Sequence, residues 1–310
     1  MAASLSKSRG KGSSHGHLGS LKYASTESFG KAYEGRGRVN MDKGTDDLSI
    51  LDRPEILMFI FVPRRATQTG PSVSYAKDYM VEVEKGVRIG CRFFSSGKDL
   101  PNILFFHGNG EIVTDYDDVA PLFREIGLNL FVADYRGYGF SNGTPTISKM
   151  ISDAHSIYDY FIDLLEKQGY TGNVLLMGRS LGSASAVELA SMYQDRVKGV
   201  IIESGFADIF SLFEHLGFPL QSLALPEGVR ERNLVKLQSI RIPTLVIHAQ
   251  HDHIVPLNQG KSVYDGVSSE EKRFLMIPNA DHNNIMMMGL KDYFNAIKIF
   301  ALGVSSESKK

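Results

Sequence analysis

The sequence contains a single cysteine, Cys91, among its 310 residues. One cysteine cannot form an intramolecular disulfide, and it cannot supply a cysteine-rich metal site. Long apolar runs are absent too: ILMFIFV at residues 56–62 is far shorter than the roughly 18 to 20 residues that a membrane-spanning helix needs. We therefore expect a cytoplasmic protein in a reducing environment. Membrane association is possible, but no feature of the sequence indicates it.

Neither sign of charge is in excess, because 34 Lys and Arg residues nearly balance 35 Asp and Glu residues. A near-neutral chain gives no electrostatic reason to bind nucleic acid, and we expect no such partner. A Walker lysine motif is also missing, and Gly137, Gly139 and Gly143 do not have the spacing of a dinucleotide-binding turn. We therefore expect no cofactor, and the oligomeric state stays open.

Residues 1–50 differ in composition from the remainder of the chain. Ser, Gly, Lys and Arg dominate this stretch, and no apolar segment of a secretory signal follows the early charges. We predict a disordered basic arm, for which a transit peptide or an expression tag is the alternative interpretation. We place one α/β domain at residues 51–304 and a short tail at 305–310.

Beyond residue 50 the pattern becomes regular. The runs at 56–62, 79–84 and 87–94 predict antiparallel strands. Near-continuous apolar runs follow, as expected for strands buried on both faces of a parallel sheet, at 102–107, 128–134, 173–178, 199–204, 243–249 and 273–278. Stretches with helical spacing alternate with them, at 115–126, 147–168, 181–194, 257–266 and 284–302. This alternation predicts a doubly wound α/β fold with its site at the carboxyl ends of the strands.

One connection, at about 205–242, is longer than a simple crossover requires and is rich in Phe and Leu. Connections of this length inside a compact domain are usually functional. We predict a short helical cap over the site, in which Phe206, Phe210 and Phe213 line a substrate pocket. One crossover helix with a loop, and ordinary core packing of these rings, are the alternatives.

The pattern G-x-S-x-G occurs twice, around Ser141 and around Ser180. A nucleophilic serine must stand clear of the backbone on a sharp turn between a strand and a helix, within reach of a base. NVLLM precedes Ser180 and the helix-forming SASAVELA follows it, whereas Ser141 is followed by the breaker cluster NGTP. We therefore predict Ser180 as the nucleophile.

The base and its orienting carboxylate are expected after the serine, in the order Ser, Asp or Glu, His, each in a loop that follows a late strand. His282 in IPNADHNNI and Asp252 in HAQHDHIVP fit these positions. Asp281 is adjacent to the histidine, but neighbouring residues on a loop rarely face each other. Asp252 would hold one imidazole tautomer and stabilise the imidazolium.

The string HAQHDH at 248–253 also has the composition of a zinc site. Against this interpretation, His248 still belongs to a strand pattern, and His253 is followed by apolar residues. A metal site would also leave Ser180 and His282 without a role. We therefore expect no metal.

Acyl hydrolysis builds negative charge on the carbonyl oxygen, and backbone N–H groups already in place stabilise that charge. One donor is expected to be the N–H of Leu181, at the start of the helix after the nucleophile. The other is expected from HGNGE at 107–111, where we choose Asn109, with Gly110 as the alternative.

Six motifs in this order, FFHGNGE, DYRGYGFSNGTP, GRSLGSASA, ESGF, HDHIVP and DHNN, resemble the α/β-hydrolase superfamily, in particular the branch of the animal α/β-hydrolase-domain protein depalmitoylases and their relatives. The resemblance covers about residues 55–303. It implies an eight-stranded, mostly parallel sheet, a triad of Ser180, Asp252 and His282, and an oxyanion hole at Asn109 and Leu181, without a cofactor.

Two departures from that branch matter. Relatives often have H-G-N-A-G, whereas Glu111 here adds a carboxylate near the hole, which would slow reaction with anionic substrates or face solvent. The animal depalmitoylases also have a cysteine-rich amino terminus, which this chain lacks.

From these features we predict a serine hydrolase that cleaves a carboxylic ester or thioester of a small molecule or acyl chain through an acyl-enzyme. A non-catalytic binding protein of the same fold, and a peptidase or amidase with the same triad, are the alternatives.

Overall fold

The computed structural model describes residues 48–67, 70–219 and 232–307. The chain divides into two units, residues 1–46 and 47–310, and the first unit lies outside the described residues together with most of the predicted arm. Residues 48–50, which we assigned to the arm, belong instead to the short 3-10 helix η1 (Leu48–Leu51), whose Leu51 is buried in the core.

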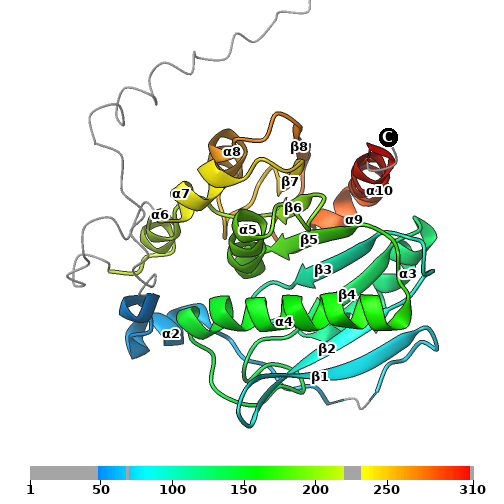
Figure 1. Ribbon diagram of the computed structural model, residues 1–310. Helices are drawn as coiled ribbons and strands as arrows, with labels where there is room; N and C mark the ends of the chain where they lie inside the picture. The colour runs from blue at the N-terminus through cyan, green and yellow to red at the C-terminus, as the bar shows by residue number, and fades with distance from the viewer. Residues whose placement is uncertain (1–47, 68–69, 220–231, 308–310) are drawn as a thin grey trace, which may run out of the picture. The chain divides into compact units, whose positions relative to one another are not determined.

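One sheet of eight strands forms the centre of the described part, in the order β1-β2-β4-β3-β5-β6-β7-β8 (Figure 1). β2 runs antiparallel to β1 and β4, and the other neighbours are parallel, which confirms the predicted mostly parallel sheet. The strands are β1 (Ala76–Glu84), β2 (Val87–Phe94), β3 (Asn102–Phe106), β4 (Asn129–Ala133), β5 (Val174–Arg179), β6 (Val200–Glu203), β7 (Thr244–Ala249) and β8 (Lys272–Ile277).

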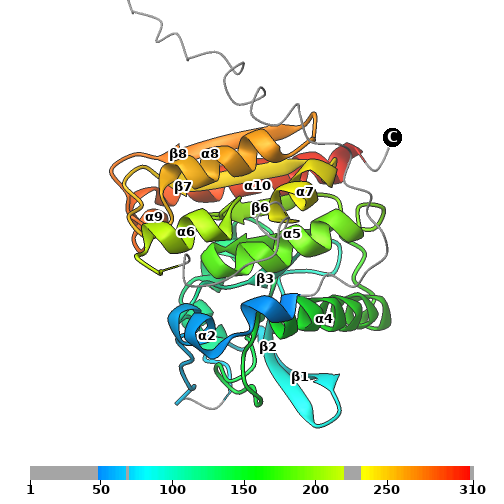
Figure 2. The same ribbon diagram turned by 90° about the vertical axis from the view of Figure 1, so that its left-hand side faces the viewer.

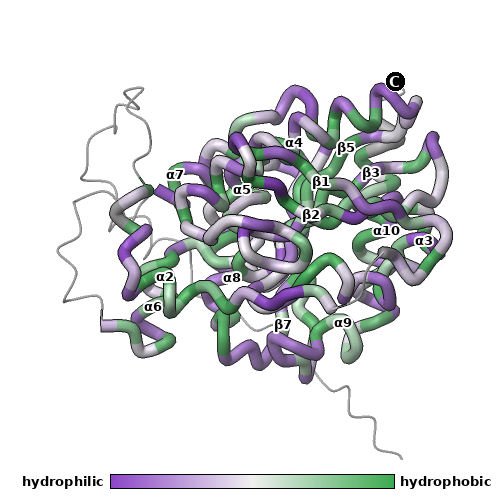
Figure 3. Tube along the Cα trace, turned by 90° about the horizontal axis from the view of Figure 1, so that it is seen from below, coloured by the Kyte–Doolittle hydropathy of each residue, from purple (hydrophilic) through white to green (hydrophobic). Residues whose placement is uncertain are grey.

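Helices cover both faces of the sheet (Figure 2). Alternate strand residues point to opposite faces, so that Leu104 of β3 joins the core under α4 (Ile147–Gln168), α5 (Ser183–Met192), α7 (Arg232–Ser239) and α8 (Leu257–Gly266). Its neighbour Phe105 joins the core under α3 (Ala120–Glu125) and α10 (Leu290–Glu307). Because helices cover both faces, interior strands such as β5 are apolar along most of their length (Figure 3).

The predicted helices are present, and two of them are interrupted. The stretch 115–126 contains η2 (Val113–Asp117) and α3, and the stretch 284–302 contains α9 (Ile285–Met288) and α10. Helix α10 ends at Glu307, so residues 305–307 of the predicted tail are helical. No helix in the described ranges is both long and apolar enough to cross a membrane.

The predicted strand at 56–62 is wrong. Residues Pro54–Ile60 form the helix α2 instead, which lies beside the carboxyl side of the sheet (Figure 1). Pro54 fits the first helical turn, and the buried side chains are those of Ile56 and Ile60, four positions apart, whereas Met58 is 83% exposed. A short apolar run does not distinguish strand from helix by composition, and here the helical period decides the burial.

The long connection at 205–242 contains two helices, α6 (Ile209–His215) and α7. Residues 220–231, which lie between them, are outside the described residues, so the cap remains a prediction.

The buried side chain of Arg92 links β1, β2 and η2 through ion pairs. Arg92 on β2 is 0% exposed, and its guanidinium donates to both carboxylate oxygens of Asp78 (2.6 and 2.9 Å) and to Asp117 (2.7 Å). Burial alone would lower the pKa of Arg92, but the two aspartates outweigh it and raise that pKa. The guanidinium is therefore charged, and it neutralises a buried carboxylate.

Arg92→Met is expected to lower the free energy of unfolding by about 3 to 5 kcal/mol, because it leaves the buried Asp117 carboxylate without its cation. Urea denaturation followed by circular dichroism measures this. Arg88→Met, at an exposed position of the same strand, is the matched control and should change stability by less than about 0.5 kcal/mol. Equal effects of the two variants would contradict a stabilising role for the buried charge.

Candidate active site

Ser180 follows β5 directly, at the start of η3 (Ser180–Gly182), which leads into α5. Its φ of 51° lies in the left-handed region, which costs energy for any residue with a side chain. A Cβ atom on Gly178 would lie 2.4 Å from the carbonyl oxygen of Gly182, and one on Gly182 would lie 2.1 Å from that of Phe106. The two glycines therefore allow this turn to pack against its neighbours, as the pattern around Ser180 predicts.

Asp252 and His282 are brought together from the loops after β7 and β8. His282 Nδ1 lies 2.8 Å from Asp252 Oδ2, and both residues are buried. Asp252 Oδ1 accepts the backbone N–H groups of Ile254 (3.0 Å) and Val255 (2.7 Å), which fixes the carboxylate. Burial would raise the pKa of Asp252, but the hydrogen bond and charge of His282 outweigh it, so that the pKa lies below its ordinary value. The carboxylate is therefore ionised at neutral pH and orients the imidazole.

Ser180, Asp252 and His282 thus follow β5, β7 and β8 at the carboxyl edge of one parallel sheet. In the described residues, Ser180 Oγ and the His282 ring do not share a hydrogen bond. In unliganded sites such contacts are often long and tighten when substrate binds. The Asp281 carboxylate has partners in its own loop, where its Oδ1 accepts the N–H groups of Asn283 and Asn284.

The hydroxyl of Ser141 binds a neighbouring strand. It is fully buried, and its Oγ accepts the N–H of Gly90 at 2.9 Å. The hydroxyl therefore satisfies a backbone donor of β2.

Three further histidines of the described residues have other partners. His107 is buried, with Nε2 3.2 Å from Asp134 Oδ1, and His155 on α4 contacts Tyr193 and Glu188. In the predicted zinc-like string, His248 is buried and its Nε2 lies 2.8 Å from the Val255 carbonyl oxygen. In the part of the chain that the structure describes, no group of three or more His, Cys, Asp or Glu side chains is arranged to hold a metal ion.

The two loops chosen for the oxyanion hole follow neighbouring strands. Phe106 of β3 pairs with Gly178 of β5, so residues 107–110 and 180–181 leave the sheet at the same edge. The Asn109 side chain accepts hydrogen bonds from the Val62 N–H (3.0 Å) and the Tyr138 hydroxyl (2.7 Å). This anchors the loop through its side chain. Leu181 lies in the first turn of η3, where a backbone N–H has no acceptor within the helix.

Arg179 is a site residue that the sequence analysis missed. Its Nη2 donates to the carbonyl oxygen of His282 at 2.7 Å, its Nη1 lies 3.1 Å from Glu111 Oε1, and its Nε lies 3.1 Å from Glu203 Oε1. The available signal was a charged residue at the end of each of two otherwise apolar strands, β5 and β6. Such residues at buried positions must be paired, and adjacent strands bring them together.

The Glu111 side chain is partly exposed (27%), and its carboxylate also has partners within the protein. Besides its contact with Arg179, its Oε2 accepts the backbone N–H of Gly108 (2.9 Å) and the Tyr116 hydroxyl (2.7 Å). Burial would raise the pKa of Glu111, but Arg179 and the other partners outweigh it and lower that pKa. The carboxylate is therefore ionised and is occupied by partners within the protein.

All three predicted pocket phenylalanines are buried. Phe206 and Phe210 line a cavity of about 60 Å³ beside α5, together with apolar residues of η1 and α4. The ring of Phe213 packs against Phe59 and Phe218. The cavity is smaller than the several hundred Å³ of a typical ligand pocket.

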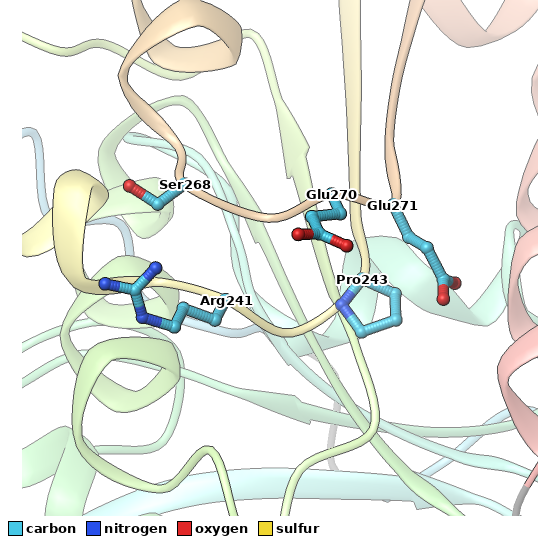
Figure 4. A pocket seen from close by; sticks show the side chains of 5 residues that line it. All are labelled: Arg241, Pro243, Ser268, Glu270 and Glu271. Carbon is cyan, nitrogen blue, oxygen red and sulfur yellow. The ribbon is translucent and has the colours of Figure 1, made fainter.

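A separate cavity of about 240 Å³ lies where β7 and β8 begin (Figure 4). Its lining is mostly polar and consists of Arg241, Pro243, Ser268, Glu270 and Glu271. It is formed at the amino ends of these strands and contains none of the predicted site residues. Sites of open parallel sheets lie at the other edge.

Comparison with known proteins finds similarity in sequence and in fold. The family model described as serine aminopeptidase, S33, matches residues 98–227. The uncharacterized protein Rv2307c of Mycobacterium tuberculosis is 26% identical, with 79% of this chain and 89% of the relative covered. The human α/β-hydrolase domain-containing protein 17B is 27% identical, with 72% and 74% covered.

Among solved structures, the esterase Pf2001 of Pyrococcus furiosus superposes with a TM-score of 0.63 at 17% identity, covering 77% of this chain and 97% of that one. Its similarity concerns the fold, which is the strand order and the helix layers described above. Taken with the sequence relatives, this fold shows that the chain belongs to the α/β-hydrolase superfamily.

Proposed function

We propose that the protein is a serine hydrolase that cleaves carboxylic esters or thioesters through an acyl-enzyme. The main support is that Ser180 occupies a left-handed turn at the end of β5, at the sheet edge where the paired Asp252 and His282 also lie. A ligand-binding protein would not require a nucleophile, a base and a buried carboxylate at this one edge.

The reaction assigns one role to each group. Ser180 Oγ attacks the carbonyl carbon and its proton passes to His282 Nε2, while Asp252 holds the Nδ1–H and stabilises the imidazolium. The backbone N–H groups of Leu181 and Asn109 donate hydrogen bonds to the negatively charged carbonyl oxygen. The bond to the leaving oxygen or sulfur then breaks, and the leaving group takes the proton from His282.

Deacylation uses the same groups with water as the nucleophile. His282 takes a proton from water, the hydroxide adds to the acyl carbon, and the carbonyl oxygen is again stabilised by the two N–H groups. The ester bond to Ser180 breaks, Ser180 regains its proton, and the carboxylic acid leaves. No step requires a cofactor.

The substrate class remains a proposal as well: an ester of a small molecule or an acyl chain, for which Phe206 and Phe210, which line the small cavity beside α5, are candidate contacts. Amide or peptide cleavage uses the same residues, and the matched family is described as a serine aminopeptidase. Assays with matched p-nitrophenyl esters, thioesters and p-nitroanilides of one acyl group therefore compare the leaving groups directly.

A fluorophosphonate probe tests the proposal. Attack by Ser180 Oγ forms an O–P bond and breaks the P–F bond, fluoride leaves, and the serine proton passes to His282. We expect one probe per folded molecule, located on Ser180 by peptide mass spectrometry, and no labelling after heat denaturation. Folded protein that stays unlabelled would favour the binding alternative.

A further inference from the structure

The buried guanidinium of Arg179 contacts three separate segments of the proposed site. It is next to Ser180 in the chain, it donates to the carbonyl oxygen of His282 (2.7 Å), and it pairs with Glu111 and Glu203 (3.1 Å each). These partners come from the loop after β8, the loop after β3 and the end of β6. One side chain thus connects the nucleophile, the base and the oxyanion loop.

Both carboxylates that form ion pairs with Arg179 accept hydrogen bonds from other groups. Glu111 accepts the N–H of Gly108 (2.9 Å), which begins the loop that contains Asn109, and the hydroxyl of Tyr116 (2.7 Å). Glu203 is fully buried and accepts the hydroxyl of Tyr293 from α10 (2.7 Å). The two tyrosines therefore fix the two carboxylates that pair with the guanidinium.

We propose that Arg179 is a positioning residue, which sets the distance of the His282 base and of the Asn109 loop from Ser180. This inference rests on the proposed serine hydrolase function. The guanidinium is planar and presents several N–H groups in fixed directions, so its three contacts determine the relative places of the three segments. A lysine ammonium keeps the charge but is a compact donor on a flexible stem, and it cannot reproduce this fixed fork.

The local sequence also fits this role. A Cβ atom on Gly108 would lie 3.0 Å from Arg179 Nη1 and 2.9 Å from Glu111 Oε1, so the glycine leaves the space in which the ion pair packs against the loop. Burial would raise the pKa of Glu203, and Arg179 opposes that rise without cancelling it. The guanidinium is thus the positive charge between two acidic groups in a buried place.

The competing explanation is that Arg179 only stabilises the fold, as Arg92 does. Arg92 is likewise a buried arginine between two carboxylates, and its partners Asp78 and Asp117 belong to β1 and η2 and not to the proposed site. It is therefore a matched control for the loss of a buried guanidinium. The two explanations differ in what happens to the rate per folded molecule.

The experiment compares Arg179→Lys and Arg92→Lys with the wild type. Circular dichroism measures the fraction of folded molecules, and fluorophosphonate labelling measures the number of reactive sites. The values of kcat and KM are measured on a short p-nitrophenyl ester. For Arg179→Lys we expect kcat and the labelling rate constant to fall by about 10- to 100-fold, because a misplacement of about 1 Å costs this much. KM should stay within about threefold, and each folded molecule should still be labelled once.

Arg92→Lys should lower the melting temperature and leave kcat per folded molecule within about twofold of the wild type. If Arg179→Lys does not fold, Glu111→Gln serves as the second variant, because Glu111 is partly exposed and the amide oxygen can still accept the Gly108 N–H. It removes the charge that holds the guanidinium, and we expect a labelling rate constant about tenfold lower.

The outcomes separate this inference from the function on which it rests. Equal labelling rate constants for wild type and either site variant would overturn the positioning role and leave the serine hydrolase intact. The same would follow if Arg179→Lys lost activity only in proportion to its loss of folded molecules. A folded wild type that is not labelled at Ser180 would overturn both.

Discussion

Replacing Ser180 with alanine is expected to lower kcat for ester hydrolysis by about 10⁴-fold or more, with little change in stability. The acyl-enzyme needs the hydroxyl, and what remains is the stabilisation of the oxyanion and the binding of substrate. The turn itself tolerates alanine no worse than serine, because both carry a Cβ at a φ of 51°. Initial rates on a p-nitrophenyl ester and a thermal melt measure the two effects.

Ser141→Ala is the matched control for this prediction, since Ser141 lies in the second G-x-S-x-G pattern. Its hydroxyl accepts the N–H of Gly90 in a buried place, so its loss should cost about 1 to 3 kcal/mol of stability through the unsatisfied donor. The rate per folded molecule should stay within about twofold. A Ser180→Ala protein that keeps wild-type activity while Ser141→Ala loses it would reverse our choice of nucleophile.

Asp252→Asn is expected to have the second largest effect, a fall in kcat of about 10⁴-fold with the fold retained. Asn has nearly the same shape, but its amide does not hold the imidazole in the required tautomer or stabilise the imidazolium. The ionised carboxylate lies 2.8 Å from His282 Nδ1 and is held by the N–H groups of Ile254 and Val255. Steady-state kinetics with the same ester and a fluorophosphonate labelling rate both report the loss.

Asp281→Asn controls for the proximity of a carboxylate to the histidine in the sequence. Asp281 accepts N–H groups of its own loop, from Asn283 and Asn284, and an asparagine oxygen can accept them as well. We expect kcat to change by less than about threefold. A large effect here with a small effect at Asp252 would mean that the wrong aspartate has been assigned to the base.

Much of the fold follows from local patterns. The parallel strands are apolar throughout because helices cover both faces of the sheet, and this produced runs whose bounds agree with the structure within one or two residues at β3, β5 and β7. The helix α4 has the bounds that its helical spacing predicted, and in the structure Thr146 caps its start and Gly169 ends it in the left-handed region. The turn at Ser180 was predicted because its glycines and the flanking strand and helix are adjacent in the chain.

Other features depended on contacts between distant segments. The run at 56–62 has the composition of a strand. In the folded protein it is the helix α2, because Ile56 and Ile60 pack on one buried side. The ion pair of Glu111 was not predictable from HGNGE, because Arg179 meets it only after β3 and β5 become neighbours.

The sequence by itself determined the order of strands and helices from β1 to β6, the turn that carries Ser180, and the choice of Asp252 and His282. These depend on hydrophobic period, glycine placement and position after a strand, which are properties of short segments. Only the tertiary structure decided that Arg179 connects the base to the oxyanion loop. Burial makes an unpaired guanidinium costly, so its partners are chosen by whichever segments the folded sheet brings within hydrogen-bonding distance.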